Sequence, residues 1–232
     1  MYDSDMSRVL FCEAIVLRAY DIGEADRFCI FFTRECGVMP ARARGARRIH
    51  SVFGGGVLPF RHVHVELVQT RGCWMVRSAR AIPESENGEQ MMISSFVLFS
   101  QGVELLLNLI EDEEPLAEVF DLLMQFMRRA AVRPQYTSSL TVFTLRLLHL
   151  LGLLALEPED LRFSNLLPEE QRYVRFCTCC VDFSMLCAAL PQGEAIAHFC
   201  RALVPTDIRF PQRSLEVSSA LFSDCFATPK HD

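Results

Sequence analysis

The sequence contains a single lysine, Lys230, among its 232 residues, whereas it contains twenty-two arginines. Because this preference for arginine runs through the whole chain, arginine abundance alone does not mark a binding site, and only the placement of positive charge is informative. Charged residues are also scarce, at 22%, while half of the residues are hydrophobic. This balance excludes a disordered chain and predicts one large or two small globular domains.

Long uncharged apolar runs are absent too. The most apolar stretch, residues 142–156, contains Arg146 and His149 and is shorter than the roughly 20 residues needed to span a bilayer. Asp3 and Asp5 lie where a secretory signal would have basic residues. We therefore expect a cytoplasmic protein without a membrane partner, in which the ten cysteines stay reduced and mostly pack as small hydrophobic groups.

Catalytic motifs are also missing from the sequence. It has no phosphate-binding loop, no Gly-x-Ser-x-Gly turn and no paired His-Glu metal motif. Three consecutive glycines at residues 54–56 lack the lysine that follows in a nucleotide-binding loop. Carboxylates are plentiful but gather in acidic turns such as residues 111–114, which are typical of solvated linkers. We therefore expect that the protein is not an enzyme.

Positive charge is concentrated in one part of the chain. Residues 27–82 contain ten arginines and only two acidic residues, Glu35 and Glu66, which gives a local charge of +8. From residue 83 onward, eleven basic residues face twenty-one acidic ones. This segregation predicts a basic binding module joined to an acidic body.

The first 82 residues have the pattern of a small β-structure. Residues 62–67 alternate polar and apolar side chains, and glycine-containing turn signals separate the apolar segments. The expected strands are Phe11–Arg18, Arg27–Thr33, Gly37–Arg44, His62–Leu67 and Cys73–Ala79. Five short strands in this length predict an OB-fold barrel as the N-terminal domain, residues 1–82.

After a polar linker at residues 83–89, the periodicity becomes helical. Three apolar stripes at three- and four-residue steps predict three helices, the last of which closes near Gly152. Residues 194–203 and 214–226 also have helical patterns, whereas residues 161–180 show no clear period. We expect an α-helical bundle over residues 90–232, and hence an α+β chain.

The most basic motif surrounds Gly45. Four arginines occupy seven positions there, Arg42, Arg44, Arg47 and Arg48, and such a group can bind the phosphates of a nucleic acid. Three aromatic residues follow, Phe53, Phe60 and Trp74. They either stack on unpaired bases or, more commonly for such residues, fill the core of the barrel.

A second constellation is formed by cysteines. Cys177 and Cys180 have the spacing of half a zinc site, but a structural zinc needs four ligands. The remaining ligands would come from Cys187, Cys200, His198 or Cys225 at irregular spacing. Segment 161–200 is thus either a degenerate zinc knuckle or a segment with ordinary thiols, and we expect no cofactor.

The residues around Gly45 resemble the RecO family of bacterial recombination mediators. The similar segments are 14–18, 23–27, 32–37, 41–48, 51–55 and 58–60, with weaker similarity at 115–123 and 143–152. The resemblance implies an N-terminal OB-fold followed by a helical domain. It also implies a nucleoid-associated protein that binds single- and double-stranded DNA, anneals complementary strands and helps to load recombinase during DNA repair.

The implied protein partners are RecR and the acidic, apolar C-terminal tail of single-strand-binding protein. The tail contact belongs to the helical part, where we would look near Arg128, Arg129, Arg133 and Arg146. Many family members also carry two Cys-x-x-Cys pairs soon after the glycine-terminated helix, where this chain has no cysteine in residues 153–158.

From the motif and the charge distribution we expect seven DNA-binding residues: Arg27, Arg34, Arg42, Arg44, Arg47, Arg48 and Arg61. The alternative is an interaction adaptor whose barrel binds a protein partner. The acidic majority of the chain and its apolar helical stripes favour that alternative.

Overall fold

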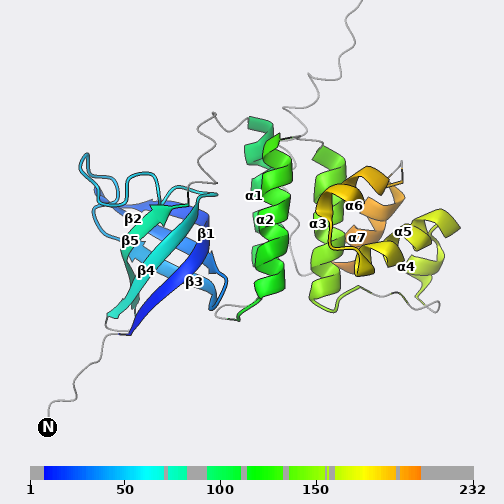
Figure 1. The fold of residues 1–232 in the computed structure, drawn as a ribbon, viewed down its shortest axis with the longest axis horizontal. Helices are drawn as coiled ribbons and strands as arrows, with labels where there is room; N and C mark the ends of the chain where they lie inside the picture. The colour runs from blue at the N-terminus through cyan, green and yellow to red at the C-terminus, as the bar shows by residue number, and fades with distance from the viewer. Residues whose placement is uncertain are drawn as a thin grey trace, which may run out of the picture. The chain divides into compact units, whose positions relative to one another are not determined.

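The computed structural model describes residues 8–70, 73–82, 93–110, 114–132, 136–154, 156, 160–191 and 194–204. In this part of the chain five strands precede seven helices (Figure 1). The chain divides into two compact units, residues 1–89 with 111–120, and residues 90–110 with 121–232. Residues 114–120, which the sequence pattern places in the helical domain, thus group with the strands. The linker at 83–89 and the helix expected at 214–226 lie outside the described residues.

The strands form a closed barrel in the order β1-β2-β3-β5-β4. Their bounds are β1 Val9–Ile22, β2 Asp26–Thr33, β3 Gly37–Ala43, β4 His62–Thr70 and β5 Cys73–Ala81. Neighbouring strands are antiparallel except for β3 and β5, whose parallel pairing closes the barrel. A closed five-stranded barrel followed by helices confirms the predicted OB-fold and the α+β class.

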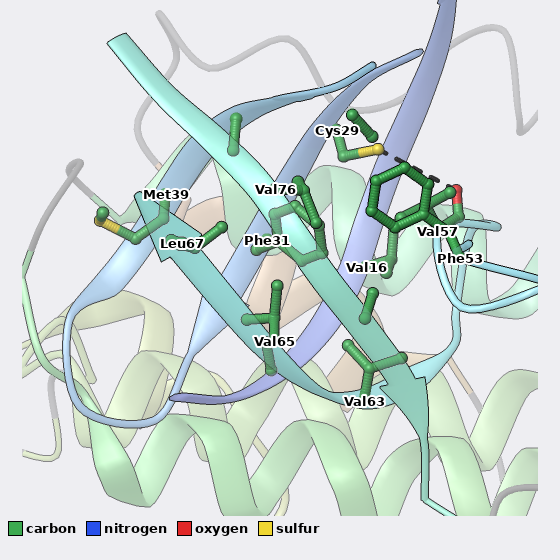
Figure 2. Close-up of a cluster of buried hydrophobic side chains, with 14 of the residues drawn as sticks. Val16, Cys29, Phe31, Met39, Phe53, Val57, Val63, Val65, Leu67 and Val76 are labelled. Carbon is green, nitrogen blue, oxygen red and sulfur yellow. Dashed lines mark hydrogen bonds between the residues drawn. The ribbon is translucent and has the colours of Figure 1, made fainter. Parts of the chain in front are cut away.

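Alternate residues of each strand fill the barrel. Phe31, Met39 and Leu67 are fully buried and lie among valines and alanines of the other strands (Figure 2). Phe53 and Val57, from the segment between β3 and β4, are part of the same core, and the Cys29 thiol donates to the Val57 carbonyl oxygen at 4.0 Å. The β3–β4 segment therefore closes one part of the barrel as well as connecting two strands.

A second apolar contact in the same unit lies outside the barrel core. The Phe120 ring packs against Phe32 at a centroid distance of 5.8 Å and against His62 at 6.1 Å. Gly37, with φ of 72°, leads into β3, and a Cβ atom there would collide with the backbone of Glu114. Residues 114–120 thus cover an outward-facing part of the barrel that would otherwise expose aromatic surface.

The helical unit is built around α3. The helices are α1 Ile93–Leu109, α2 Ala117–Val132, α3 Tyr136–Leu150, α4 Leu161–Ser164, α5 Pro168–Cys179, α6 Phe183–Ala189 and α7 Ala195–Leu203. Helix α3 contacts α1, α5, α6 and α7. At the centre, the Phe126 ring stacks on Phe143 at 4.5 Å and meets Phe99 and Phe183 edge-on. Gly102 gives Phe126 this room, because a Cβ atom at residue 102 would lie 2.5 Å from the Phe126 ring.

Helices α4 and α5 occupy the segment in which the sequence shows no clear period. Asp160 caps α4 by accepting a hydrogen bond from the Arg162 backbone N–H, and Pro168 begins α5. Helix α4 has only four residues, and α5 buries Glu170, Tyr173, Val174 and Cys177 at helical spacing, but the first of these is charged and so hides the apolar stripe. Across the residues that the structure describes, no helix is both long and apolar enough to cross a membrane.

Candidate nucleic-acid interface

The turn between β1 and β2 gathers the arginines of the Gly45 motif. Gly23, with φ of 57°, reverses the chain there, and an aspartate lies on each side of it, Asp21 and Asp26. Asp26 accepts hydrogen bonds from the Arg42 Nε at 3.0 Å, the Arg42 Nη2 at 2.7 Å and the Gly45 backbone N–H at 2.8 Å. This one carboxylate thus joins the turn, strand β3 and the start of the β3–β4 segment.

Asp21 binds two further arginines. Its Oδ1 accepts from the Arg27 Nε at 3.0 Å, and its Oδ2 lies 3.2 Å from the Arg47 Nε. Arg47 also donates from its backbone N–H to the Ala25 carbonyl and from Nη1 to the Gly23 carbonyl, both at 2.9 Å. The β1–β2 turn and the β3–β4 segment are therefore fastened together by backbone as well as charge.

The hydrogen bonds at this turn shift the pKa of the Asp26 carboxyl. The Gly45 N–H and then the Arg42 guanidinium hold the Asp26 pKa below its usual range, because both stabilise the ionised form. Asp26 therefore stays charged at neutral pH and keeps Arg42 oriented.

Arg44 and Arg48 are the most available cations of the motif. Both are exposed, and in the described part of the chain no carboxylate lies within ion-pair range of either guanidinium. The Arg48 backbone N–H donates to the Gly45 carbonyl at 3.1 Å, and the Ser51 backbone N–H donates to the Arg48 carbonyl at 3.0 Å. Successive turns of this kind hold the segment in shape while its arginine side chains face solvent.

The structure does not bring all seven predicted arginines together. Arg27, Arg42, Arg44, Arg47 and Arg48 gather at the β1–β2 turn and the adjoining ends of β2 and β3. Arg34 follows the other end of β2, about 23 Å from Arg27 at the usual strand rise. Its guanidinium lies 5.7 Å from the centre of the Phe120 ring, and it is half-buried. Arg61 precedes β4, and its carbonyl accepts from the backbone of Val16 in the middle of β1.

The aromatic residues named in the sequence belong to the core. Phe53, Phe60 and Trp74 are all buried, and Phe53 and Trp74 are members of the barrel cluster. The base-stacking alternative for these three rings is therefore wrong in this structure. The rings of Phe53 and Trp74 fill the barrel, and the burial of Phe60 likewise leaves no face for a base.

Two aromatic residues that the sequence analysis missed lie beside the arginines. Tyr20 of β1 is directly opposite Phe28 of β2, which is directly opposite Arg42 of β3. The neighbouring positions Ala19, Cys29 and Ala41 point in the opposite direction, and Cys29 and Ala41 lie in the barrel core. Tyr20 and Phe28 therefore lie on the outer face. The missed signal is the Arg18-Ala19-Tyr20 alternation, which continues β1 four residues beyond the predicted end at Arg18.

The cysteine segment does not form a metal centre in the described residues. Cys177, Cys187 and Cys200 are buried, and no three His, Cys, Asp or Glu side chains are grouped so that they could hold a metal ion there. Cys225 lies outside the described residues. A structural zinc needs four ligands, so the described cysteines do not form such a site by themselves.

The helical unit holds a polar hollow of about 320 Å³. Its lining includes two arginines, Arg128 and Arg129, one carboxylate, Asp182, and the apolar side chains of Val132 and Phe183. Arg146 is engaged elsewhere, because its Nη1 donates to the carbonyl of Cys177 at 2.5 Å near the end of α5. Arg133 lies outside the described residues.

Sequence comparisons agree with the fold. The family described as "Recombination protein O N terminal" matches residues 6–83. The chain is 33% identical over 142 residues to a protein of Myxococcus xanthus named DNA repair protein RecO, a match that covers 61% of this chain and 58% of the relative. Proteins of the same name from Anaeromyxobacter and Geobacter metallireducens are each 31% identical, over 64% and 60% of this chain and 59% and 57% of their own lengths. The chain thus spans less than two thirds of the length of these relatives, and its N-terminal barrel, residues 6–83, is similar to the N-terminal domain of the RecO family.

Proposed function

We propose that the protein acts in DNA repair as a mediator without catalytic chemistry of its own, and that its barrel binds DNA phosphates. The observation that carries this proposal is the gathering of five arginines beside the β1–β2 turn: Arg27 is on β2, Arg42 is on β3, and Arg44, Arg47 and Arg48 are at the start of the β3–β4 segment. Strands 2 and 3 and the loop between strands 1 and 2 form the surface that OB-folds use for oligonucleotides. The name shared by the relatives, DNA repair protein RecO, supports the same role.

The proposed domains are residues 1–82 for DNA binding and residues 90–232 for the helical part, of which residues 111–120 group with the barrel. Arg44 and Arg48 contact phosphates first, because the described carboxylates leave both guanidinium groups unpaired. Arg42, oriented by Asp26, adds a further contact, and Arg27 and Arg47 add theirs in competition with Asp21. Guanidinium groups held in this way bind phosphate oxygens in pairs and fix the course of the backbone.

We propose that annealing and recombinase loading both begin with a DNA strand that the barrel holds. A strand fixed along one face of the barrel meets a complementary strand at a raised local concentration, which favours pairing without bond chemistry. The partners that we propose are RecR and the C-terminal tail of single-strand-binding protein. The hollow lined by Arg128 and Arg129 supports the second of these, because two arginines against one aspartate, Asp182, leave its lining net positive beside apolar side chains, which suits an acidic, apolar peptide.

A salt titration of oligonucleotide binding tests the proposal. Four or five phosphate contacts predict a slope of log affinity against log salt of roughly −3 for single strands. Removing Arg44 and Arg48 together, as Arg44→Ala with Arg48→Ala, makes the slope shallower by about 1.4. The matched control removes two exposed arginines of the helical unit, as Arg172→Ala with Arg201→Ala, and leaves the slope unchanged. A flat slope for the unaltered protein, or no binding at low salt, contradicts the proposal.

The second candidate is a protein-interaction adaptor, and the net charge of −6 favours it. A variant with alanine at residues 42, 44, 47 and 48 separates the two functions. DNA binding that survives this change while capture of a protein partner fails supports the adaptor. Loss of DNA binding supports the mediator.

A further inference from the structure

Tyr20, Phe28 and Arg42 form one row across three adjacent strands on the outer face of the barrel. Tyr20 is register partner to Phe28, and Phe28 is register partner to Arg42. Direct partners on one face of an antiparallel pair have their Cβ atoms about 4.5–5.5 Å apart. The row therefore brings the Cβ atoms of two aromatic residues and one arginine close together on one face, next to the turn that gathers the other arginines.

The rings of this row are accessible. Tyr20 is 47% exposed and Phe28 is half-buried, although outward-facing aromatic residues are usually covered in a folded domain. The Phe32 ring, further along β2, is by contrast not accessible, because the Phe120 ring covers it at a centroid distance of 5.8 Å. Within the described part of the chain, neither the Tyr20 ring nor the Phe28 ring packs against another aromatic ring.

The Tyr20 ring is also held in place. The Arg18 Nη1 donates to the Tyr20 hydroxyl at 3.3 Å, and Arg18 lies on the same face of β1, opposite Ile30. Arg42 at the other end of the row is oriented by two hydrogen bonds to Asp26. An aromatic surface between two fixed cations matches the chemistry of a nucleotide, in which a flat base is attached to a phosphate.

We propose that the row Tyr20–Phe28–Arg42 stacks the unpaired bases of single-stranded DNA and makes the barrel prefer single strands to duplex. This inference rests on the proposed function and adds the strand form to it. In duplex DNA the base faces are already stacked on their neighbours, so the arginines still reach phosphates while the rings gain nothing. Single strands use both the arginines and the rings.

The test compares three variants of Tyr20 in the full chain. Tyr20→Leu keeps an apolar side chain on the strand but removes the ring. It should lower the affinity for a single-stranded oligonucleotide by about 5- to 150-fold, the range that corresponds to 1–3 kcal/mol of stacking per base. Tyr20→Phe keeps the ring and should retain most of the affinity, whereas Tyr20→Ala should resemble Tyr20→Leu. The affinity for a duplex of the same sequence should change by less than about 2-fold in all three, since phosphate contacts remain.

A second measurement reports stacking directly and not through affinity. An oligonucleotide that carries 2-aminopurine in place of adenine should change its fluorescence on binding, because stacking on an aromatic side chain quenches this base. The change should disappear with Tyr20→Leu at protein concentrations high enough to saturate the DNA. Thermal unfolding of each variant shows that the barrel is intact.

The outcomes separate the inference from the proposed function. Equal losses of single-strand and duplex affinity, or no loss of either, overturn stacking on the row but leave the phosphate site in place. Unaltered protein that binds no DNA at low salt overturns both. Single-strand affinity that falls with Tyr20→Phe as far as with Tyr20→Leu also overturns the inference, because it assigns the effect to the hydroxyl and not to the ring.

Discussion

The Asp26 carboxylate accepts a hydrogen bond from the backbone N–H of Gly45 at 2.8 Å across nineteen positions of sequence. Gly45 itself has φ of 70°, a conformation that glycine adopts at little cost. The same carboxylate binds Arg42 at 2.7 Å. One side chain in the β1–β2 turn thereby fixes both the direction of an arginine and the path of the basic segment that follows it.

We predict that Asp26→Asn loosens the basic segment. The neutral amide binds Arg42 less strongly and places an NH₂ group near the Gly45 N–H, so amide hydrogen exchange at Gly45 and Arg48 should speed up. Glu24→Gln is the matched control, because it removes the same charge from the same turn without a hydrogen bond in the described residues. Equal exchange rates in the two variants would show that Asp26 does not hold the segment.

The same contact should depend on pH in a defined direction. Because the Asp26 pKa is lowered in the folded protein, its contribution is complete above the usual carboxyl pKa of about 3.9 and is lost as the pH falls through the lower folded value. A pH titration of the Gly45 amide resonance by NMR should therefore show its transition below pH ~3.9. A transition at or above that pH would contradict the proposed hydrogen bond.

Asp21→Asn should strengthen DNA binding. Asp21 competes with phosphate for Arg27 and Arg47, and its removal frees both guanidinium groups. Since exposed ion pairs of this kind contribute about 0.2–1 kcal/mol, the affinity should rise by about 2- to 5-fold at low salt. The rise should fade at high salt and should exceed that of Glu24→Gln, which alters the local charge equally but frees no arginine. Weaker DNA binding by Asp21→Asn would mean that the aspartate positions the two arginines for DNA.

These two aspartates also show where sequence analysis reaches its limit. Alternating apolar residues were enough to predict five strands and the OB-fold, because barrel burial imposes a period of two. The charge count that marks residues 27–82 as basic begins one residue after Asp26, so it omits both carboxylates that bind the arginines. The pairing of Asp26 with Arg42, sixteen positions along the chain, depends on which strands become neighbours, and a linear pattern does not contain that information.

The length of β1 is the other feature that the sequence pattern does not predict correctly. The turn signal at Asp21-Ile22-Gly23 correctly marks a reversal, but β1 runs to Ile22 and not to Arg18. The four additional residues contain Tyr20, the aromatic residue with the clearest exposure beside the arginines. Conversely, Phe53, Phe60 and Trp74 are close to the motif in sequence but are buried. Proximity along the chain therefore predicts the arginine group better than it predicts the aromatic surface.

Gly37→Ala should destabilise the protein more than Gly54→Ala. Both glycines have positive φ, 72° and 51°, so both substitutions impose the cost of a left-handed residue, about 1–2 kcal/mol. At Gly37 the new Cβ atom also collides with the backbone of Glu114, whereas nothing lies within 4 Å at Gly54. Overpacking of this kind adds about 1–3 kcal/mol, measured as the difference in free energy of unfolding between the two variants. Equal losses would show that residues 114–120 do not press against β3 in solution.

The cysteines offer a test of the barrel core that needs no substitution. Burial raises the pKa of Cys29 to about 11 and that of Cys12 to about 12, so at pH 8 only about one Cys29 thiol in a thousand is ionised, and fewer at Cys12. Cys73 and Cys179 are exposed. Because alkylation requires both the thiolate and access, iodoacetamide at pH 8 should label Cys73 and Cys179 well before Cys29 and Cys12. Mass spectrometry of timed samples measures the order, and labelling in denaturant should make the four rates similar. Labelling of Cys29 as fast as Cys73 in the native protein would mean that the β3–β4 segment opens readily at Phe53 and Val57, because the Cys29 thiol donates a hydrogen bond to the Val57 carbonyl oxygen of that segment.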